Sequence, residues 1–312
     1  MNTTSYRAWG LLLALGGVVG FSFRPILIKL CYAEHDITPV TLLFLRMTVS
    51  LPVFAAIAWW LARGGASGVP PAPIKGREWL GIAGLGFIGY YGASFLDFLG
   101  LQYVGAGVGR LINFLYPTMV LALTFAFLHK APTRREIGAL VMSYAGIALV
   151  VSNQLGVGSE GRLFLFGVFF CLANALCYAI YLVAGGELTR RIGSMRFTAW
   201  TMMVATVPAV LQFVVIEPAS ALDLPPKAWF YVMLMVVFAT ILPVFMVAEA
   251  LRRIGANHFA MIGALSPVVT VIAGAVGLEE PVTVLQALGG VLVVAGVLLV
   301  SMKPRADKPA AA

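Results

Sequence analysis

The hydrophobic positions of this chain form long, nearly uninterrupted runs, and the polar residues are concentrated in short stretches between them. A helix that spans a membrane needs about 20 mostly apolar residues. Ten runs meet this requirement, at residues 8–30, 39–62, 78–101, 104–128, 135–153, 163–186, 196–216, 228–250, 256–278 and 283–302. The pattern therefore predicts an all-α integral membrane protein with ten transmembrane helices.

The composition leads to the same class of protein. Hydrophobic residues make up 61% of the 312 residues and charged residues 11%, with a mean hydropathy of +0.95. A soluble domain averages about 45–50% apolar and about 25% charged residues, so a soluble globule of this chain could not cover its surface with polar groups. This excludes a cytoplasmic enzyme, a nucleic-acid-binding protein and a disordered protein.

The basic residues predict how the chain is oriented. If the N-terminus is cytoplasmic and ten spans alternate, the cytoplasmic side receives Arg7, Arg63, Lys75, Arg77, Lys130, Arg134, Arg135, Arg190, Arg191, Arg196, Arg252, Arg253, Lys303, Arg305 and Lys308. The far side receives only Arg162 and Lys227. Because cytoplasmic loops are enriched in Lys and Arg, we expect a multi-pass protein of a bacterial-type inner (plasma) membrane. Both termini, including the tail at 303–312, are then cytoplasmic.

The two halves of the chain resemble each other when one is shifted by 150 residues. Leu101, Gly105 and Pro117 then match Leu251, Gly255 and Pro267, and Thr133 matches Thr283. Each half holds five predicted spans, and an odd number inserts the second half upside down. We therefore predict two domains, residues 1–153 and 154–302, which form a 5+5 inverted repeat around a central cavity. Inverted repeats are typical of transporters, with the substrate near the midplane.

One motif in these halves resembles a known family. In the second half, a helix proline, Pro267, is followed by the turn Leu278-Glu279-Glu280-Pro281-Val282-Thr283 and a Gly-rich helix with Ala295-Gly296. This order resembles the drug/metabolite transporter superfamily with paired EamA domains, across essentially the whole chain. The first-half turn, His129-Lys130-Ala131-Pro132-Thr133, has Lys130 where that family usually has Glu. This difference favours a role in helix capping or topology for the turn acid. The resemblance implies export of small metabolites, often amino acids, as in exporters of the YddG type.

Ionisable residues inside the spans are candidates for function because they are costly in lipid. They are Arg24, Lys29, Arg46, Asp97 and Arg110. We expect Lys29 and Arg46 to snorkel to the membrane interface. Asp97 and Arg110 lie close to one short loop, so we expect an ion pair between them, with proton coupling by Asp97 as the alternative. Arg24 is the deepest of these residues, and it is our first choice for binding a substrate carboxylate.

A second set of candidates consists of aromatic, hydroxyl and amide side chains at mid-depth. With Arg24, the predicted substrate-binding residues are Tyr90, Tyr91, Ser94, Asn113, Tyr116, Asn174, Tyr178 and Tyr181. A buried asparagine facing lipid would be expensive, so both asparagines should face the interior. The alternatives are interhelical hydrogen bonding for the asparagines and core packing for the tyrosines. Pro117 and Pro267 are symmetry mates that permit kinks, and we predict hinges there.

These residues favour a secondary transporter that exports small metabolites by alternating access. Four basic residues and one acid inside the spans favour a substrate with a carboxylate, and the aromatic residues suit neutral or aromatic amino acids. The alternatives are a passive facilitator of other metabolites and a lipid flippase, with a lateral opening lined by Arg24, Arg46 and Arg110. The exact substrate and the oligomeric state stay open, and the sequence is compatible with a monomer.

The sequence shows no arrangement of residues that is typical of an enzyme active site. Its three histidines, His35, His129 and His258, lie in or beside different connections, so we expect no catalytic site and no metal site. The glycines of Gly84-Leu85-Gly86-Phe87-Ile88-Gly89 match a dinucleotide fingerprint, but that motif requires a preceding strand, so we expect no cofactor. The expected partners are a small-molecule substrate and membrane lipid, with no nucleic acid.

Overall fold

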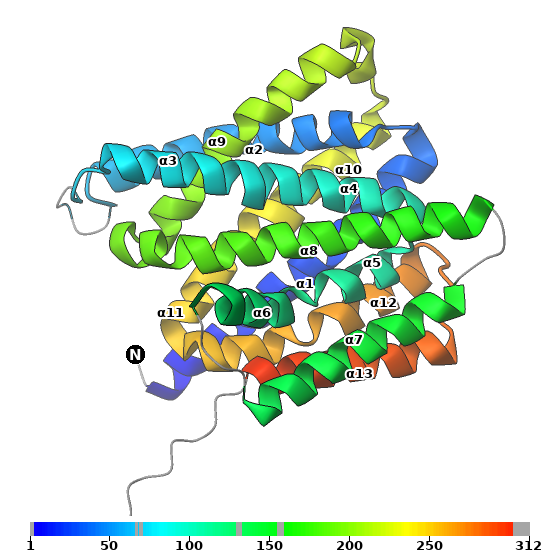
Figure 1. The fold of residues 1–312 in the computed structure, drawn as a ribbon. Coiled ribbons are helices and arrows are strands. Elements are labelled where there is room, and N and C mark those ends of the chain that lie inside the picture. Colours follow the sequence, from blue (N-terminus) through cyan, green and yellow to red (C-terminus); the bar gives the residue numbers. More distant parts are fainter. Residues whose placement is uncertain (1–2, 66–67, 69–70, 129–132, 155–158, 302–312) are drawn as a thin grey trace, which may run out of the picture.

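The computed structural model describes residues 3–65, 68, 71–128, 133–154 and 159–301, and no strand occurs within these ranges. Long helices cross the molecule side by side, joined by short connections (Figure 1). The first half holds α1 (Thr3–His35), α2 (Pro39–Ala62), α3 (Gly76–Leu85), the π-helical segment η2 (Gly86–Gly92), α4 (Ala93–Tyr103), α5 (Ala106–Asn113), α6 (Tyr116–Leu128) and α7 (Arg134–Gln154).

The second half has the same general order of elements. It holds α8 (Ser159–Ile192), α9 (Ser194–Ile216), the short 3₁₀ helix η3 (Ala219–Leu222), α10 (Pro226–Val236), the π-helical segment η4 (Val237–Ile241), α11 (Leu242–Gly263), α12 (Ser266–Gly277) and α13 (Val284–Ser301). The chain is therefore an all-α membrane protein, as the hydrophobic pattern predicts.

The helices that can cross a membrane differ in length, and not all of them are as long as the ten predicted spans. Within the described residues, eight helical stretches are long and apolar enough to cross, and two further apolar helices are shorter, Met261–Gly277 and Val284–Leu299. The backbone explains part of this difference. Gly255 has φ 74° and ψ 166°, a conformation that a residue with a side chain rarely adopts. Gly255 lies in the stretch between the predicted spans 228–250 and 256–278, so this break falls where the hydrophobic pattern also places a boundary.

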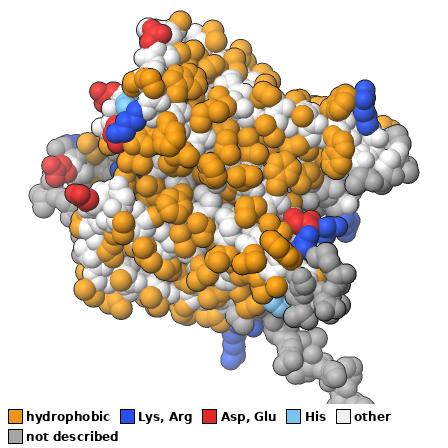
Figure 2. Space-filling view, turned by 180° about the vertical axis from the view of Figure 1, so that it is seen from behind, with side chains coloured by type: hydrophobic (Ala, Val, Ile, Leu, Met, Phe, Trp, Pro, Cys, Tyr) orange, Lys and Arg blue, Asp and Glu red, His pale blue; other side chains and the backbone are white. Residues whose placement is uncertain are grey.

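The outer surface of the bundle matches a lipid environment. Large apolar side chains project outward from several helices; Leu80 is 75% exposed and Val276 is 81% exposed. Figure 2 shows one face that is covered largely by hydrophobic side chains, with Lys, Arg, Asp and Glu gathered at its margins. In water such a surface would be unfavourable, whereas hydrocarbon chains solvate it.

The repeated threonines begin equivalent helices. Thr133 Oγ1 accepts a hydrogen bond from the Glu136 backbone N–H (3.3 Å), and the Glu136 carboxylate accepts one from the Thr133 N–H (2.7 Å). This is the reciprocal capping box that stabilises helix starts, here at the start of α7. Thr283 Oγ1 accepts from the Gln286 N–H (3.1 Å) at the start of α13. The match read from the sequence therefore has a local physical cause.

Irregular backbone segments also recur at this spacing. The π-helical segments η2 and η4 occupy corresponding places in the two halves. The turn at residues 114–115 separates α5 from α6, and the turn at 264–265 separates α11 from α12. Pro117 and Pro267 lie directly after these turns, where the missing proline N–H costs no helical hydrogen bond. The predicted hinge prolines therefore lie beside breaks in two helices.

The two halves pack against each other along several helix pairs. α2 packs along α9, α7 along α13, α1 along α11, and α4 along α8. The α7–α13 contact is close because glycines face each other. A Cβ added to Gly146 would lie 2.6 Å from the Gly289 carbonyl oxygen, and one added to Gly289 would lie 2.5 Å from the Gly146 carbonyl oxygen. Small residues let membrane helices approach closely.

This contact predicts different effects for two glycines of α7. We expect Gly146→Ala to lower the stability of the purified protein by about 1–3 kcal/mol, because the methyl group overlaps Gly289. Gly138→Ala is the matched control, since nothing lies within 4 Å of an added Cβ there. Thermal unfolding in detergent measures both variants, and equal melting temperatures would contradict the proposed packing.

Candidate functional site

A buried carboxylate, Asp97 on α4, is the centre of a polar cluster inside the bundle. Its side chain is 1% exposed, and its Oδ2 lies 2.9 Å from Nη2 of Arg24 on α1. Its Oδ1 accepts hydrogen bonds from the amides of Asn113 on α5 (2.5 Å) and Asn174 on α8 (3.2 Å). The Asn174 amide also donates to Asn113 Oδ1 (2.8 Å). Four helices from both halves therefore meet at one carboxylate.

The ion pair differs from the one expected from the sequence. Asp97 and Arg110 are close along the chain, but Asp97 pairs with Arg24, which is 73 residues away. The reason is the direction in which Arg110 extends. Its Nε (3.0 Å) and Nη2 (2.5 Å) both donate to Ser266 Oγ at the start of α12. Tertiary packing, rather than sequence distance, thus selects the partner.

Arg110 belongs to a second polar network that joins the two halves. Ser266 Oγ lies 2.7 Å from Ser22 Oγ on α1, and both side chains are buried. Thr270 Oγ1 donates to the Ser22 carbonyl oxygen (2.9 Å). Single serines and threonines are common in apolar runs, so the sequence alone does not single out these hydroxyl residues. The signal that could have found Ser266 is its position at the break before Pro267.

Two basic residues that we expected to snorkel point elsewhere. Arg46 on α2 is 2% exposed; its Nη2 donates to Ser94 Oγ (2.6 Å), and its Cζ lies 5.3 Å from the centre of the Phe98 ring. Arg46 lies on the side of α2 that meets α4, so its side chain enters the bundle rather than the membrane interface. Lys29 is half-buried and its Nζ donates to the Val104 carbonyl oxygen (3.0 Å). The expectation of interfacial side chains was wrong for Arg46, and the contact of Lys29 is internal.

Four of the candidate tyrosines form a continuous row of rings. The ring centres of Tyr116 and Tyr178 are 5.1 Å apart, those of Tyr178 and Tyr181 are 6.1 Å apart, and those of Tyr181 and Tyr90 are 5.2 Å apart. Such spacings are typical of favourable aromatic pairs. Tyr91 does not join this row and packs against two phenylalanines of η2 and α4.

The cluster keeps some capacity to bind another group. The Arg24 side chain is 22% exposed, while Asp97 beside it is 1% exposed. The Nε atoms of Arg24 and Arg46 are buried and have no hydrogen-bond partner among the described residues. A guanidinium presents five donors in a planar fork that matches a carboxylate or a phosphate. The arrangement is therefore suited to binding an anion.

One end of the bundle near this cluster is held by contacts between the halves. The Glu280 carboxylate accepts hydrogen bonds from the N–H groups of Ala106 (2.7 Å) and Gly107 (3.3 Å) at the start of α5. A carboxylate there satisfies free donors and interacts favourably with the helix dipole. The turn acid thus caps a helix, as the sequence suggested. Its first-half counterpart, the turn His129–Pro132 with Lys130, lies outside the described residues.

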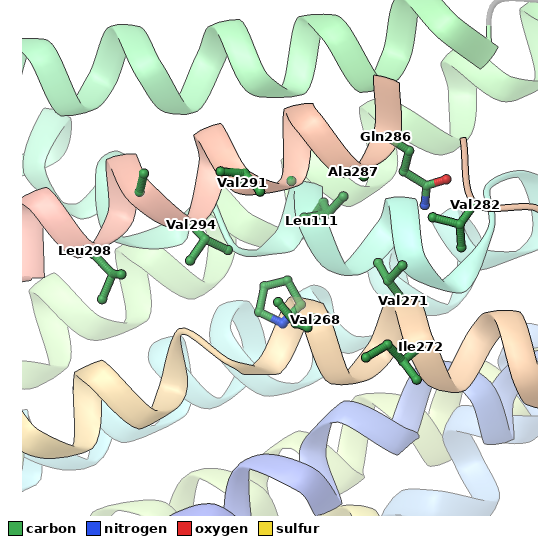
Figure 3. Close-up of a pocket in the computed structure, with 13 residues that line it drawn as sticks. Leu111, Val268, Val271, Ile272, Val282, Gln286, Ala287, Val291, Val294 and Leu298 are labelled. Carbon is green, nitrogen blue, oxygen red and sulfur yellow. The ribbon is translucent and has the colours of Figure 1, made fainter. Parts of the chain in front are cut away.

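An apolar pocket of ≈ 400 Å³ lies between α5, α12 and α13 (Figure 3). Leu111, Val268, Val271 and Val294 contribute hydrocarbon surface to it, and Gln286 is a polar side chain at one end. Such a lining suits an apolar chain rather than a charged metabolite. We therefore assign the candidate substrate site to the polar cluster around Asp97.

Comparisons with known proteins agree with a transporter. The sequence profile of the EamA-like transporter family matches residues 8–152 and again residues 165–302. The chain is 28% identical over 290 residues to the uncharacterized transporter YcbK of Bacillus subtilis, covering 90% of this chain and 89% of that protein. It is 22% identical over 309 residues to the uncharacterized transporter sll1319 of Synechocystis, covering 94% and 93%.

A solved crystal structure has a similar fold. It superposes with a TM-score of 0.63 over 93% of this chain and 94% of that chain, at 17% sequence identity. Similarity at this level concerns the fold alone. The substrate has to be argued from the residues of this chain.

The Arg24–Asp97 pair predicts a strong coupling between two substitutions. Asp97→Asn should destabilise the protein by about 3–5 kcal/mol, because it removes the buried carboxylate and leaves the partly buried Arg24 without a counter-charge. The double variant Arg24→Gln/Asp97→Asn should lose less stability than the sum of the single variants, with a coupling of about 1–3 kcal/mol. Denaturant unfolding of all four proteins measures the cycle. The exposed pair Arg190–Glu187 is the control and should show coupling near zero; additive effects at Asp97 would contradict the pair.

The Glu280 cap predicts a difference between neighbouring acids of one turn. We expect Glu280→Gln to lower stability by about 0.5–2 kcal/mol, because a neutral amide caps the α5 N-terminus less well than a carboxylate. Glu279→Gln is the matched control, since Glu279 is exposed. Melting temperatures in detergent compare the two, and an equal loss in both variants would contradict the cap.

Proposed function

Because this chain belongs to the EamA-like transporter family, we propose that it is a secondary transporter that exports small carboxylate-bearing metabolites by alternating access. Amino acids are the first class to test, as the sequence suggested. The observation that carries this proposal is Arg24, a partly exposed guanidinium inside a membrane bundle with a free Nε atom. Intramembrane charges of this kind mark substrate or ion pathways.

The two-fold character of the packing supports alternating access. In an inverted repeat, a contact between α1 and α11 requires an equivalent contact between α8 and α4, and both occur. The pairs α2–α9 and α7–α13 each join equivalent helices, as a two-fold axis in the membrane plane would require. We therefore propose that residues 1–153 and 154–302 are inverted copies. Exchange of their conformations would open the site to each side in turn.

The broken helices supply the moving parts of this mechanism. α5 and α6 meet at the turn 114–115, and α11 and α12 meet at 264–265, each beside a proline. Arg110 and Asn113 lie on α5 just before the first break, so a change of angle there would move both side chains relative to Asp97. We propose that Pro117 and Pro267 act as the hinges, and that the Glu280 cap closes one end of the passage.

The membrane and the orientation follow from the charges of the loops. We propose an inner (plasma) membrane location with both termini in the cytoplasm, based on the concentration of Lys and Arg on one side of the predicted spans. In this orientation the turn that holds Glu280 lies on the outer side. The cap would then close the outer end of the passage.

We propose a separate role for each group of residues in the site. Arg24 binds the substrate carboxylate, which replaces Asp97 as its partner, and Asn113 and Asn174 keep hydrogen bonds to Asp97. The tyrosine row from Tyr116 to Tyr90 offers aromatic surface for an apolar or aromatic part of the substrate. Asp97, released from Arg24, is the group that could accept a proton, so transport coupled to a proton gradient would pass through it.

Transport in proteoliposomes tests this function. We expect purified protein to exchange labelled neutral and aromatic amino acids, and Arg24→Ala to reduce exchange by roughly tenfold or more, because a charge-assisted hydrogen bond contributes about 1.5–3 kcal/mol. Arg190→Ala is the control, since Arg190 is 78% exposed and should leave exchange unchanged. Absence of exchange across a broad panel of amino acids would count against this substrate class, and full activity of Arg24→Ala would remove Arg24 from the site.

A further inference from the structure

The charges of the polar cluster do not balance. Three guanidinium groups lie in this cluster and in the adjoining Ser266 network, on Arg24, Arg46 and Arg110. The carboxylate of Asp97 pairs directly with Arg24 alone. Arg46 and Arg110 both interact with the Asp97 carboxylate, which attracts them, and with the Arg24 guanidinium, which repels them. The cluster and the adjoining Ser266 network together therefore carry an excess of two positive charges inside the bundle.

No other acid of the described chain compensates for this excess. Seven acids have partners elsewhere, namely Glu34 (Lys227), Glu78 (Arg191), Glu136 (Thr133), Glu187 (Arg190), Glu217 (Thr38), Glu249 (Arg252 and Arg253) and Glu280 (the α5 N-terminus). Four others, Asp36, Glu160, Asp223 and Glu279, are exposed. Asp97 is thus the acid of the cluster in the part of the chain that the structure describes.

The two arginines without a carboxylate have neutral partners. Arg46 donates to Ser94 Oγ and Arg110 donates to Ser266 Oγ. A hydroxyl satisfies a donor but does not neutralise a charge, and Arg46 is 2% exposed. A buried charge without a counter-charge is expensive, so its presence in this position calls for a ligand that supplies the missing charge.

Lys29 provides an internal comparison. It lies on α1 like Arg24, but it is within electrostatic range of Glu280 and donates to a backbone carbonyl. The Lys29 region at the capped end is therefore close to neutral. The excess of positive charge is confined to the cluster that contains the candidate substrate site.

We propose that this site takes a small organic dianion, a molecule with two anionic groups such as a dicarboxylate or a phosphate monoester. This inference rests on the proposed transport function and specifies the charge of the substrate. Arg46, beside Ser94, and Arg110, beside Ser266, supply two sets of donors. The Arg24 guanidinium repels both of these charges. A dianion neutralises the excess of two charges, whereas a zwitterionic amino acid leaves it in place.

The binding of small probes to the purified wild-type protein tests the inference at pH 7.5. Succinate and glycerol 3-phosphate are the dianions, lactate is the monoanion and alanine is the zwitterion. We expect at least one dianion to bind roughly tenfold or more tightly than lactate and alanine, measured by calorimetry and by ligand-induced thermal stabilisation. Succinate alone would indicate a dicarboxylate, and glycerol 3-phosphate alone a phosphate monoester.

Neutral replacements of the two arginines separate a binding role from a structural one. We expect Arg46→Gln and Arg110→Gln to lose the preference for dianions. We also expect each ligand-free variant to melt at the same or a higher temperature than the wild type, because an uncompensated buried charge has been removed. Arg190→Gln is the exposed control and should change neither quantity.

Three results would overturn the inference. They are binding of alanine or lactate as tight as that of both dianions, absence of binding by either dianion, and an unchanged charge preference in both glutamine variants. Amino-acid exchange in proteoliposomes distinguishes these failures from failure of the proposed function. Exchange of neutral amino acids without dianion binding would leave a transporter whose substrate is not a dianion, whereas absence of any exchange would count against the proposed function itself.

Discussion

The ion pair between Arg24 and Asp97 is the interaction on which the interior of this protein depends. Charges in a low-dielectric interior interact strongly, but their removal from water is costly. The pair is tolerated because Asn113 and Asn174 supply further hydrogen bonds to the carboxylate. These residues come from four helices in both halves, so the position of one carboxylate depends on the packing of the whole bundle. A change of angle in any of the four helices would change the distances between the Asp97 carboxylate and its partners.

A second constraint comes from the lipid. Backbone groups exposed to hydrocarbon must be satisfied within the helix, so breaks in spanning helices are tolerated only where protein surrounds them. The turns at 114–115 and 264–265 occur beside polar side chains: Asn113 precedes the first and Ser266 follows the second. Irregular backbone and polar chemistry are therefore found together. This coincidence is expected in a protein that must bind a polar solute and also change its shape within a membrane.

The hydrophobic pattern and the match of the two halves predicted much of the fold because they reflect local physics. An apolar run of sufficient length forms a helix in lipid, and Thr133 and Thr283 cap helices through contacts within one turn. The pattern did not predict the turns at 114–115 and 264–265, which lie inside the predicted spans 104–128 and 256–278, because hydropathy does not register a backbone dihedral angle. It also did not predict the π-helical segments, which change the direction of side chains without changing composition.

The sequence by itself determined the class of the protein, the helices and the short set of intramembrane charges, since each follows from neighbouring residues and the cost of polarity in lipid. Only the tertiary structure decided the partners of those charges. Asp97 could have paired with Arg110, which is near in sequence, but α1 brings Arg24 to the carboxylate and α12 brings Ser266 to Arg110. Pairing of this kind depends on which helix faces meet, and that is set by packing over the entire bundle rather than by any local stretch of the chain.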